Sequence, residues 1–219
     1  MYNQFYKLMK QKTFNYNLPL KDNIYNFYVS NSNKDAYNYI INETENINYC
    51  IIKGPKKCGK THLGKIWKSK NTAIDYDLKN SYSINLVQNI FIDNFLDNLD
   101  EEKFFHLINH CFDNKLKILL STDKDMANFN FLLSDLSSRL KTFNFLSIDE
   151  PDDELIFNIA IKLLLDKQII IKNPDVIHYF LNRIERTYLS INNFINKIDK
   201  LSLEKKRELT IPLIKELIY

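Results

Sequence analysis

A glycine-containing loop that follows a short apolar run is the feature that most constrains the fold of this chain. Residues 54–61 read Gly-Pro-Lys-Lys-Cys-Gly-Lys-Thr, a complete G-x4-G-K-[ST] pattern, directly after the apolar run at residues 49–52. The sequence has only three glycines, and this loop holds two of them, Gly54 and Gly59. Glycine lets backbone N–H groups close around a phosphate, so the pattern predicts a strand, a phosphate-binding loop and a helix that begins at Lys60.

The loop predicts a site for ADP or ATP with Mg²⁺. We expect Lys60 to place its ammonium group against the terminal phosphate oxygens, and Thr61 to offer its hydroxyl group to Mg²⁺. For His62, a place on the surface of the following helix is the alternative to a role in the site. The cofactor-binding residues predicted from this segment are Gly54, Pro55, Lys56, Lys57, Cys58, Gly59, Lys60, Thr61 and His62.

Composition argues against several other classes of protein. A chain of 219 residues is long enough for one α/β domain with a small appendage. The net charge of +3 is too small to indicate nucleic-acid binding, so we expect no sequence-specific contact with DNA. The three cysteines fit no metal or disulfide spacing, and no apolar run reaches the ~18 residues that span a membrane. We therefore expect a cytoplasmic protein without membrane association.

The order of apolar segments predicts an α/β fold followed by helices. Five predicted strands lie at residues 49–52, 72–75, 89–93, 117–121 and 143–148, with helices between them. Short apolar strands separated by helices are typical of a parallel sheet with right-handed crossovers. Beyond Pro151 the pattern predicts four helices and no strands, at residues 152–167, 174–184, 188–203 and 212–218. We predict an extended arm over residues 1–20, a nucleotide-binding subdomain over 21–150 and a helical subdomain over 151–219.

An acid at the end of a predicted strand supplies a second candidate for the metal site. Asp93 ends the strand at residues 89–93 and has the position of a Walker B acid, which orients Mg²⁺; a turn residue is the alternative. Many ATPases carry a second acid at the next position to activate the attacking water, but here that residue is Asn94. An amide orients a water and cannot accept its proton. We therefore expect the chain to bind nucleotide better than it hydrolyses it. Asp97 is the next acid, but it lies three residues beyond the position of the second acid and is no obvious replacement.

For several other polar residues, the sequence permits either a functional or a purely structural role. The segment Ser121–Asp123 follows a predicted strand and is either a sensor of the γ-phosphate or an ordinary turn. Arg139 near the end of a helix is, by itself, explained by the helix dipole. Arg183, Arg186 and Arg207 are candidates for a nucleotide-contacting arginine from the helical part, and each is also acceptable as a surface residue.

These motifs together resemble the AAA+ domain of the DnaA/Hda family over nearly the whole chain. The loop continues as G-K-T-H-L, and Phe27-Tyr28-Val29 with Ser32-Asn33 resembles the segment that leads to the nucleotide base. Residues 135–140 match the family's D-L-x-S-R-L box, and residues 186–190 resemble its R-E-L-E-G box. Ser30 and Ser190 stand where those two motifs have glycine. The terminus L-T-I-P at residues 209–212 closely resembles that of the Hda branch.

The resemblance implies a fold and roles for particular residues. It implies an AAA+ domain with a parallel five-stranded sheet, followed by a small all-helical lid. Arg139 would act as a finger on nucleotide bound by a neighbouring subunit. Arg186 would be the sensor 2 arginine, and Val29 would contact the nucleotide base. Asn94 agrees with the Hda branch, as does the lack of room after the last predicted helix for a DNA-binding domain.

The arm resembles a motif that docks on the sliding clamp of DNA polymerase III. Residues 11–16 read Gln-Lys-Thr-Phe-Asn-Tyr, so Gln11, Phe14 and Tyr16 are the predicted clamp-binding residues. A glutamine with two apolar anchors in an extended peptide can fill a hydrophobic pocket on a partner. Lys12 replaces the usual leucine. A register through Tyr16, Leu18 and Leu20, or an untethered aromatic tail, are the alternatives.

The resemblance implies a negative regulator of replication initiation. It would act with the sliding clamp on a DnaA-like initiator and stimulate hydrolysis of the ATP that this partner binds. Its own ATPase activity is expected to be weak, and self-association as a homodimer stays open. Two alternatives share the loop and the fold: a helicase-loader-type or DnaA-like ATPase, and a nucleotide-locked adaptor that does not stimulate hydrolysis.

Overall fold

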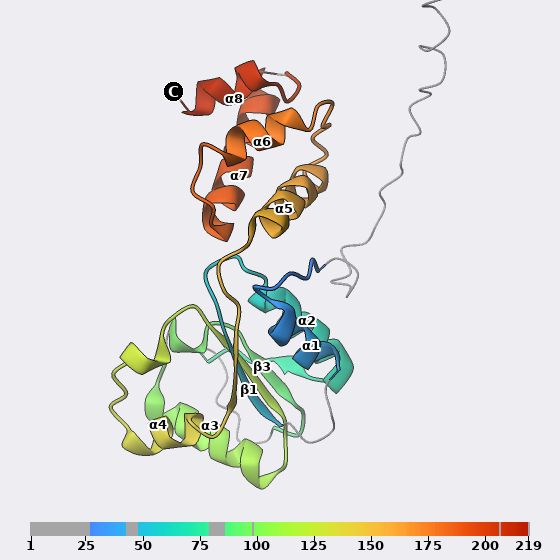
Figure 1. Cartoon of the computed structure of the whole chain (residues 1–219). Coiled ribbons are helices and arrows are strands. Elements are labelled where there is room, and N and C mark those ends of the chain that lie inside the picture. The colour runs from blue at the N-terminus through green and yellow to red at the C-terminus, as the bar shows by residue number, and fades with distance from the viewer. Residues whose placement is uncertain (1–26, 43–47, 79–85, 98, 206, 219) are drawn as a thin grey trace, which may run out of the picture.

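The computed structural model describes residues 27–42, 48–78, 86–97, 99–205 and 207–218. The predicted arm over residues 1–20, with Gln11, Phe14 and Tyr16, lies outside these ranges. The described residues form a layered α/β unit and a helical unit joined by a narrow connection (Figure 1). The strands are β1 (Tyr49–Lys53), β2 (Ile74–Asp75), β3 (Ile90–Ile92), β4 (Ile118–Thr122) and β5 (Asn144–Ser147).

The five strands form one parallel sheet in the order β2-β3-β4-β1-β5. The predicted five-stranded parallel sheet is therefore confirmed. The residues of β3 and β4 are all buried, whereas β2 and most of β5 are exposed. Central strands of a parallel sheet are covered on both faces, which is why their sequences are continuous apolar runs.

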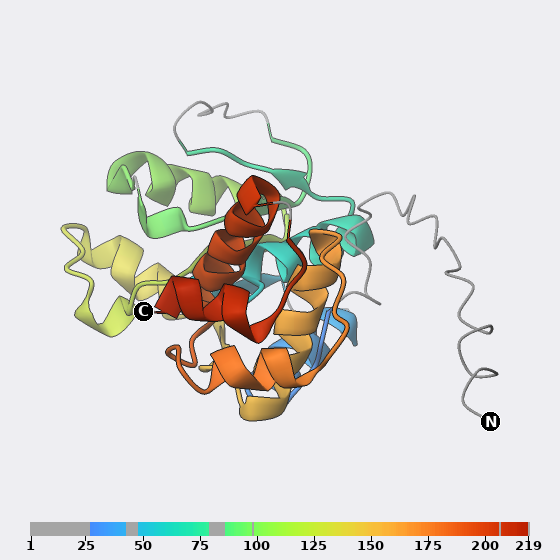
Figure 2. The same cartoon turned by 90° about the horizontal axis from the view of Figure 1, so that it is seen from above.

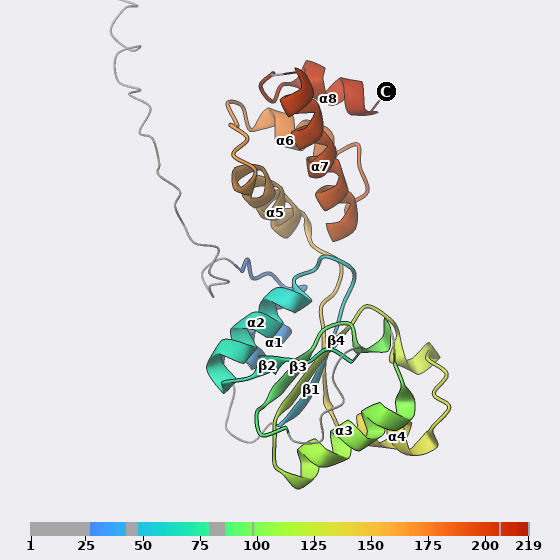
Figure 3. The ribbon, with the colours of Figure 1, turned by 180° about the vertical axis from the view of Figure 1, so that it is seen from behind.

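Helices cover both faces of the sheet. On one face lie α1 (Lys34–Ile41) and α2 (Lys60–Asn71), and on the other lie α3 (Glu101–Asp113) and α4 (Ser134–Leu140) (Figures 1 and 3). Successive residues of β1 alternate between the two cores: Ile51 packs with the α3–α4 layer, and Ile52 packs with the α1–α2 layer. The sequence patterns did not predict α1, whose buried face consists only of Ala36 and Ile40.

The carboxyl-terminal part is all helical, as predicted. It contains α5 (Asp153–Asp166), α6 (Asp175–Leu181), α7 (Tyr188–Lys205) and α8 (Ile211–Ile218), and the view from above shows them around a common centre (Figure 2). The Asp152 carboxylate caps α5 by accepting from the backbone N–H of Leu155 at 2.8 Å. This helical lid has a hydrophobic core of its own, separate from the two cores that flank the sheet.

The starts of α5 and α7 pack against the α1–α2 layer. Tyr188, the first residue of α7, is 1% exposed and packs in the same cluster as residues of α1 and α2. Its hydroxyl group lies 3.4 Å from Ser32 Oγ. Burial raises the pKa of Tyr188 to about 12, so the phenol stays protonated at neutral pH. Within the described residues, no helix combines the length and the hydropathy that crossing a membrane requires.

Candidate nucleotide-binding site

The loop between β1 and α2 requires glycine at two positions. A Cβ atom on Gly54 would lie 2.8 Å from Cys58 Sγ and 2.9 Å from Ile148 Cβ. Gly59 precedes α2 with a φ of 102°, and a Cβ atom there would lie 2.8 Å from the Phe27 ring. Between them, Lys57 also has a positive φ, of 68°. Such left-handed residues turn successive N–H groups toward one side, which forms an anion-binding concavity.

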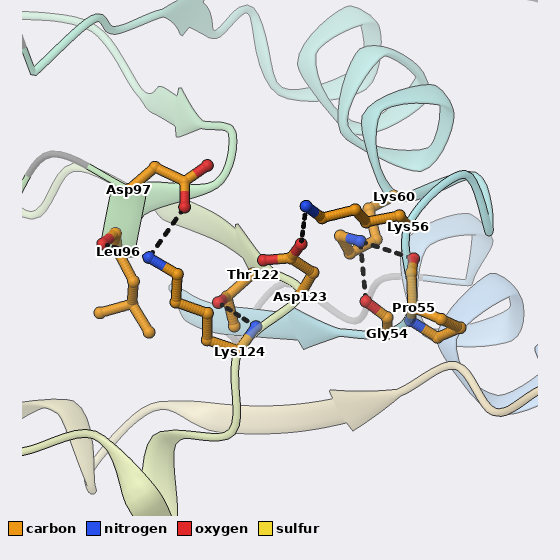
Figure 4. Close-up of polar contacts among 9 residues, drawn as sticks. All are labelled: Gly54, Pro55, Lys56, Lys60, Leu96, Asp97, Thr122, Asp123 and Lys124. Atoms are coloured by element: carbon orange, nitrogen blue, oxygen red, sulfur yellow. Dashed lines mark hydrogen bonds and ion pairs between the residues drawn. The ribbon is translucent and has the colours of Figure 1, made fainter. Parts of the chain in front are cut away.

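Lys60 places a charged group inside this loop. The residue is 6% exposed, and its ammonium group donates to the carbonyl oxygens of Gly54 at 2.8 Å and Pro55 at 2.9 Å (Figure 4). An ammonium group has three donors, and these bonds use two of them. Among the described residues, no carboxylate lies within 4.0 Å of Lys60 to neutralise its charge. A buried charge is costly without an opposite charge, so the loop chemically fits a phosphate group.

The residues predicted to hold Mg²⁺ lie together beside the loop. Thr61 Oγ1 donates to Asp93 Oδ2 at 2.6 Å, and Ser121 Oγ donates to the other carboxylate oxygen, Asp93 Oδ1. Ser121 is fully buried, whereas Thr61 and Asp93 are exposed. Hydroxyl and carboxylate oxygens are the ligands that Mg²⁺ prefers, so the exposed pair fits this cation. Ser121 fixes the carboxylate from the side of the protein interior.

Asn94 is at a turn that favours this residue type. It lies between β3 and the 3₁₀ helix η2 (Phe95–Asp97), with a φ of 49°, and asparagine tolerates the left-handed region better than most residues. Its backbone N–H donates to Ser121 Oγ at 2.9 Å. The carboxylate of Asp97, the other acid near Asn94, pairs with Lys124 Nζ at 2.9 Å (Figure 4).

A cleft of about 520 Å³ begins at the Thr61–Asp93 pair and extends toward β2. Asn94 and Asp97 line it, but neither Gly54 nor Gly59 does. The cleft therefore lies next to the phosphate loop and does not coincide with it.

The segment Ser121–Asp123 is tied to the phosphate loop. Asp123 Oδ2 lies 3.6 Å from Lys56 Nζ, and Thr122 Oγ1 accepts from the backbone N–H of Lys124 at 3.0 Å (Figure 4). The bond at Thr122 is that of a turn residue, whereas Asp123 points to a lysine of the loop. The contact of Thr122 agrees with the turn alternative, and a role of the segment as a γ-phosphate sensor stays a prediction.

The entry segment contacts the loop through the side chain of Phe27, its first aromatic residue, to which the sequence analysis gave no individual role. The Phe27 ring lies against Gly59, stacks on Tyr37 at 5.6 Å between centroids, and meets the His62 ring edge-on at 5.6 Å. His62 therefore contacts the entry segment. Val29 is 44% exposed and lines a separate cavity of about 250 Å³ at the start of α5. The family-like motif Phe27-Tyr28-Val29 contained Phe27, but it did not indicate contact with Gly59.

Cys58 in the loop is a packing residue in this structure. It is 5% exposed, and burial raises the pKa of its thiol to about 11, although the nearby Lys60 ammonium acts in the opposite direction. The thiol is therefore protonated at neutral pH, and a protonated thiol is a poor nucleophile.

Arg139 lies far from the phosphate loop of its own chain. It belongs to α4, and its guanidinium carbon lies 4.7 Å above the centroid of the Phe112 ring. That ring in turn lies 4.0 Å from the ring of Tyr49, the first residue of β1. Gly54 follows the other end of this strand, and five steps of about 3.3 Å place it about 16 Å from Tyr49. Arg139 and the loop therefore lie at opposite ends of β1.

Of the three lid arginines, only Arg186 contacts the start of the lid. Its guanidinium group donates to Asp153 Oδ1, on the first residue of α5, and to Asn182 Oδ1 at 3.3 Å. The structure brings the predicted loop residues, Thr61 and Asp93 together in one place and holds Arg186 in contacts within the lid. Arg183 instead stacks on Tyr179 at 3.7 Å, and Arg207 pairs with Glu216 at 3.1 Å.

Comparison with known proteins finds similarity to Hda and DnaA. Residues 166–218 match the family model described as Hda, lid domain. DnaA of Buchnera aphidicola subsp. Cinara cedri is 26% identical over 233 residues, which cover 90% of this chain and 52% of that protein. The chain thus spans about half the length of this relative.

Solved DnaA structures have the same fold. Domain III of Thermotoga maritima DnaA matches with a TM-score of 0.74 at 20% identity, over 91% of this chain and 98% of that chain. AMPPCP-bound DnaA from Aquifex aeolicus matches with a TM-score of 0.65 at 23% identity, over 86% and 69% of the two chains.

Proposed function

Because the chain is an AAA+ protein of the DnaA/Hda family, we propose that it binds an adenine nucleotide and supplies Arg139 to ATP on a DnaA-type partner. The position of Arg139 supports the second part of this proposal, its action on ATP bound by a partner. The Arg139 guanidinium group lies on the Phe112 ring at the end of β1 remote from its own loop, so it is not placed to reach a nucleotide bound there. Among the described residues it has no carboxylate within 4.0 Å, so no ion pair would have to break before it contacts a partner.

Binding of the nucleotide rests on the loop. The N–H groups around Gly54 and Gly59 would surround the phosphates, and the third donor of the Lys60 ammonium group would bond a terminal phosphate oxygen. Thr61 and Asp93 would hold Mg²⁺, which neutralises phosphate charge when it is bound. The structure of Aquifex aeolicus DnaA with bound AMPPCP supports an adenine nucleotide as the ligand.

Weak turnover of this nucleotide follows from the residues near Asp93. A general base must accept the proton of the attacking water, and the amide of Asn94 cannot do so. The neighbouring acid Asp97 is paired with Lys124. In this proposal the chain holds its nucleotide as a structural element, and the hydrolysis that matters occurs on the partner.

In the complex, Arg139 would stabilise the charge that develops when the partner hydrolyses ATP. A guanidinium group that reaches the γ-phosphate from another subunit lowers the barrier by electrostatic stabilisation, and such a residue is worth about 10³–10⁵ in rate. Hydrolysis would return the initiator to its ADP form and so oppose initiation. The arm would dock on the sliding clamp through Gln11, Phe14 and Tyr16 and bring the chain to its partner.

The decisive experiment mixes this protein, DNA-loaded clamp and the ATP-bound initiator, and follows ATP hydrolysis. We expect Arg139→Ala to reduce the stimulated rate about 10³-fold or more and to leave nucleotide binding by this chain unchanged. Arg183→Ala is the matched control, because it also removes a guanidinium group stacked on an aromatic ring and should keep the stimulation. Full stimulation by Arg139→Ala would refute the finger role. A complex that forms without stimulation by the wild-type protein would identify the nucleotide-locked adaptor instead.

Clamp binding is tested separately in the full chain. The triple substitution of Gln11, Phe14 and Tyr16 by alanine should abolish co-purification with the clamp, since it removes the polar contact and both apolar anchors. Clamp binding by the triple variant would show that another surface makes the contact.

A further inference from the structure

Glu101 holds the loop in front of α4 from a different helix. The residue begins α3, and its two carboxylate oxygens accept from consecutive backbone N–H groups: Leu132 N at 3.1 Å and Leu133 N at 2.8 Å. Glu101 is more than thirty positions from both leucines, so the contact exists only because α3 and α4 lie side by side (Figures 1 and 3). A carboxylate that accepts two N–H groups makes charge-assisted hydrogen bonds, which are stronger than neutral ones.

This contact replaces a cap that α4 lacks in its own sequence. Leu133 is the N-cap residue of α4, and its apolar side chain cannot accept a hydrogen bond from the first turn. In a capping box, a glutamate of the first turn reaches back to the N–H of the N-cap residue. Glu101 makes that bond from α3, and its negative charge lies at the positive end of the helix dipole.

Arg139 is attached to the element that this contact orients. The helix α4 has seven residues, or about 10 Å at 1.5 Å per residue, and Arg139 is the last but one of them. Leu136 and Leu140 are 0% and 1% exposed and anchor one side of the helix in the core. The carbonyl of Arg139 also accepts from Thr142 Oγ1 at 2.7 Å. These two leucines fix which face of α4 meets the core, and Glu101 fixes the backbone at the start of the helix.

We propose that Glu101 is a positioning residue for Arg139. It locks the start of α4 and thereby fixes the direction in which the guanidinium group is presented to the nucleotide of the partner. The inference rests on the proposed function and adds to it a residue that does not touch the nucleotide. Leu132, which Glu101 holds by its backbone, is 88% exposed, so this residue faces solvent in the loop that precedes the helix of Arg139.

The test measures stimulated ATP hydrolysis by the initiator as the concentration of this protein rises. Glu101→Ala removes both acceptors and should lower the plateau rate about 10–100-fold, because small misplacements of a reacting group cost that much. Glu101→Gln keeps one carbonyl acceptor and should give an intermediate plateau. Glu102→Ala is the control: it removes the same charge from the same turn, at an exposed residue, and should keep the wild-type plateau.

The shape of the titration separates positioning from folding. A variant that is only partly folded needs more protein for half-maximal stimulation and reaches the same plateau, whereas a misdirected guanidinium group lowers the plateau itself. In the Arg139→Ala background, Glu101→Ala should have no further effect on the plateau. A wild-type plateau in both Glu101 variants, with stimulation lost in Arg139→Ala, would overturn the positioning role and leave the proposed function standing. Stimulation that persists in Arg139→Ala would overturn both.

Discussion

Replacing Lys60 with methionine tests whether the loop is built for an anion. In the protein without nucleotide, the substitution removes two charge-assisted hydrogen bonds, to Gly54 O and Pro55 O, each worth about 1.5–3 kcal/mol. It also relieves the burial of an ammonium group that is 6% exposed, a penalty of several kcal/mol. The two effects oppose each other and are similar in size. We therefore expect the free energy of unfolding without nucleotide to change by no more than about 1 kcal/mol.

The wild-type protein and Lys60→Met should differ in how much bound nucleotide stabilises them. At a concentration of about 100 times Kd, a ligand stabilises the wild-type protein by about 2.7 kcal/mol, which raises Tm by about 5–10 °C for a chain of this size. Loss of one partner of a buried charged contact costs about 2–5 kcal/mol, so Lys60→Met should bind about 30-fold more weakly or worse. At the same nucleotide concentration the rise in Tm then falls to about 1–3 °C.

Thermal unfolding followed by fluorescence, with and without Mg²⁺ and ADP or ATP, measures both quantities. Lys197→Met is the control, because it removes the same charge from an exposed position on α7. A nucleotide-induced rise in Tm of wild-type size in Lys60→Met would refute the anion site. A loss of several kcal/mol without nucleotide would refute the argument that the two hydrogen bonds of Lys60 do no more than offset the cost of burying its charge.

Two further predictions concern packing and protonation. Gly64→Ala should destabilise the protein by about 1–2 kcal/mol in urea unfolding, because overpacking outweighs the helix propensity of alanine; the new Cβ atom would lie 2.1 Å from Phe91 Cζ. Gly64→Ala with Phe91→Leu should recover part of the loss, and equal stability of Gly64→Ala and wild type would contradict the packing. Burial raises the pKa of Cys58 to about 11 from 9.0, so the folded state retains this proton longer than the unfolded state. Stability from this group should therefore fall as pH rises from 9 toward 11, and alkylation of Cys58 at pH 8 should be much slower in folded than in urea-unfolded protein.

The sheet and the glycine-containing loop between β1 and α2 were predictable because their signals are local. Gly54, Gly59 and Lys60 lie within seven positions of one another, and the backbone conformation that they need is a property of those residues. The buried strands are continuous apolar runs because both faces of a central parallel strand are covered. The predicted bounds of an edge strand were less accurate: β2 has two residues, whereas the predicted strand at residues 72–75 has four.

Local signals did not reach α1, with its two buried residues, or the contact of Phe27 with Gly59. A short helix with a small apolar face and an aromatic residue outside any period both resemble ordinary loop sequence.

Sequence alone determined that a strand leads into a glycine-containing loop, that Asp93 stands at the end of another strand, and that nearly the last third of the chain is helical. Only the tertiary structure decided how these parts face one another. The strand order β2-β3-β4-β1-β5 brings Ser121 against Asp93, and the packing of α3 beside α4 brings Glu101 to the start of the helix that carries Arg139. These contacts join residues about thirty positions apart, and no periodic pattern along the chain encodes such a pairing, because it depends on which elements become neighbours in the folded core.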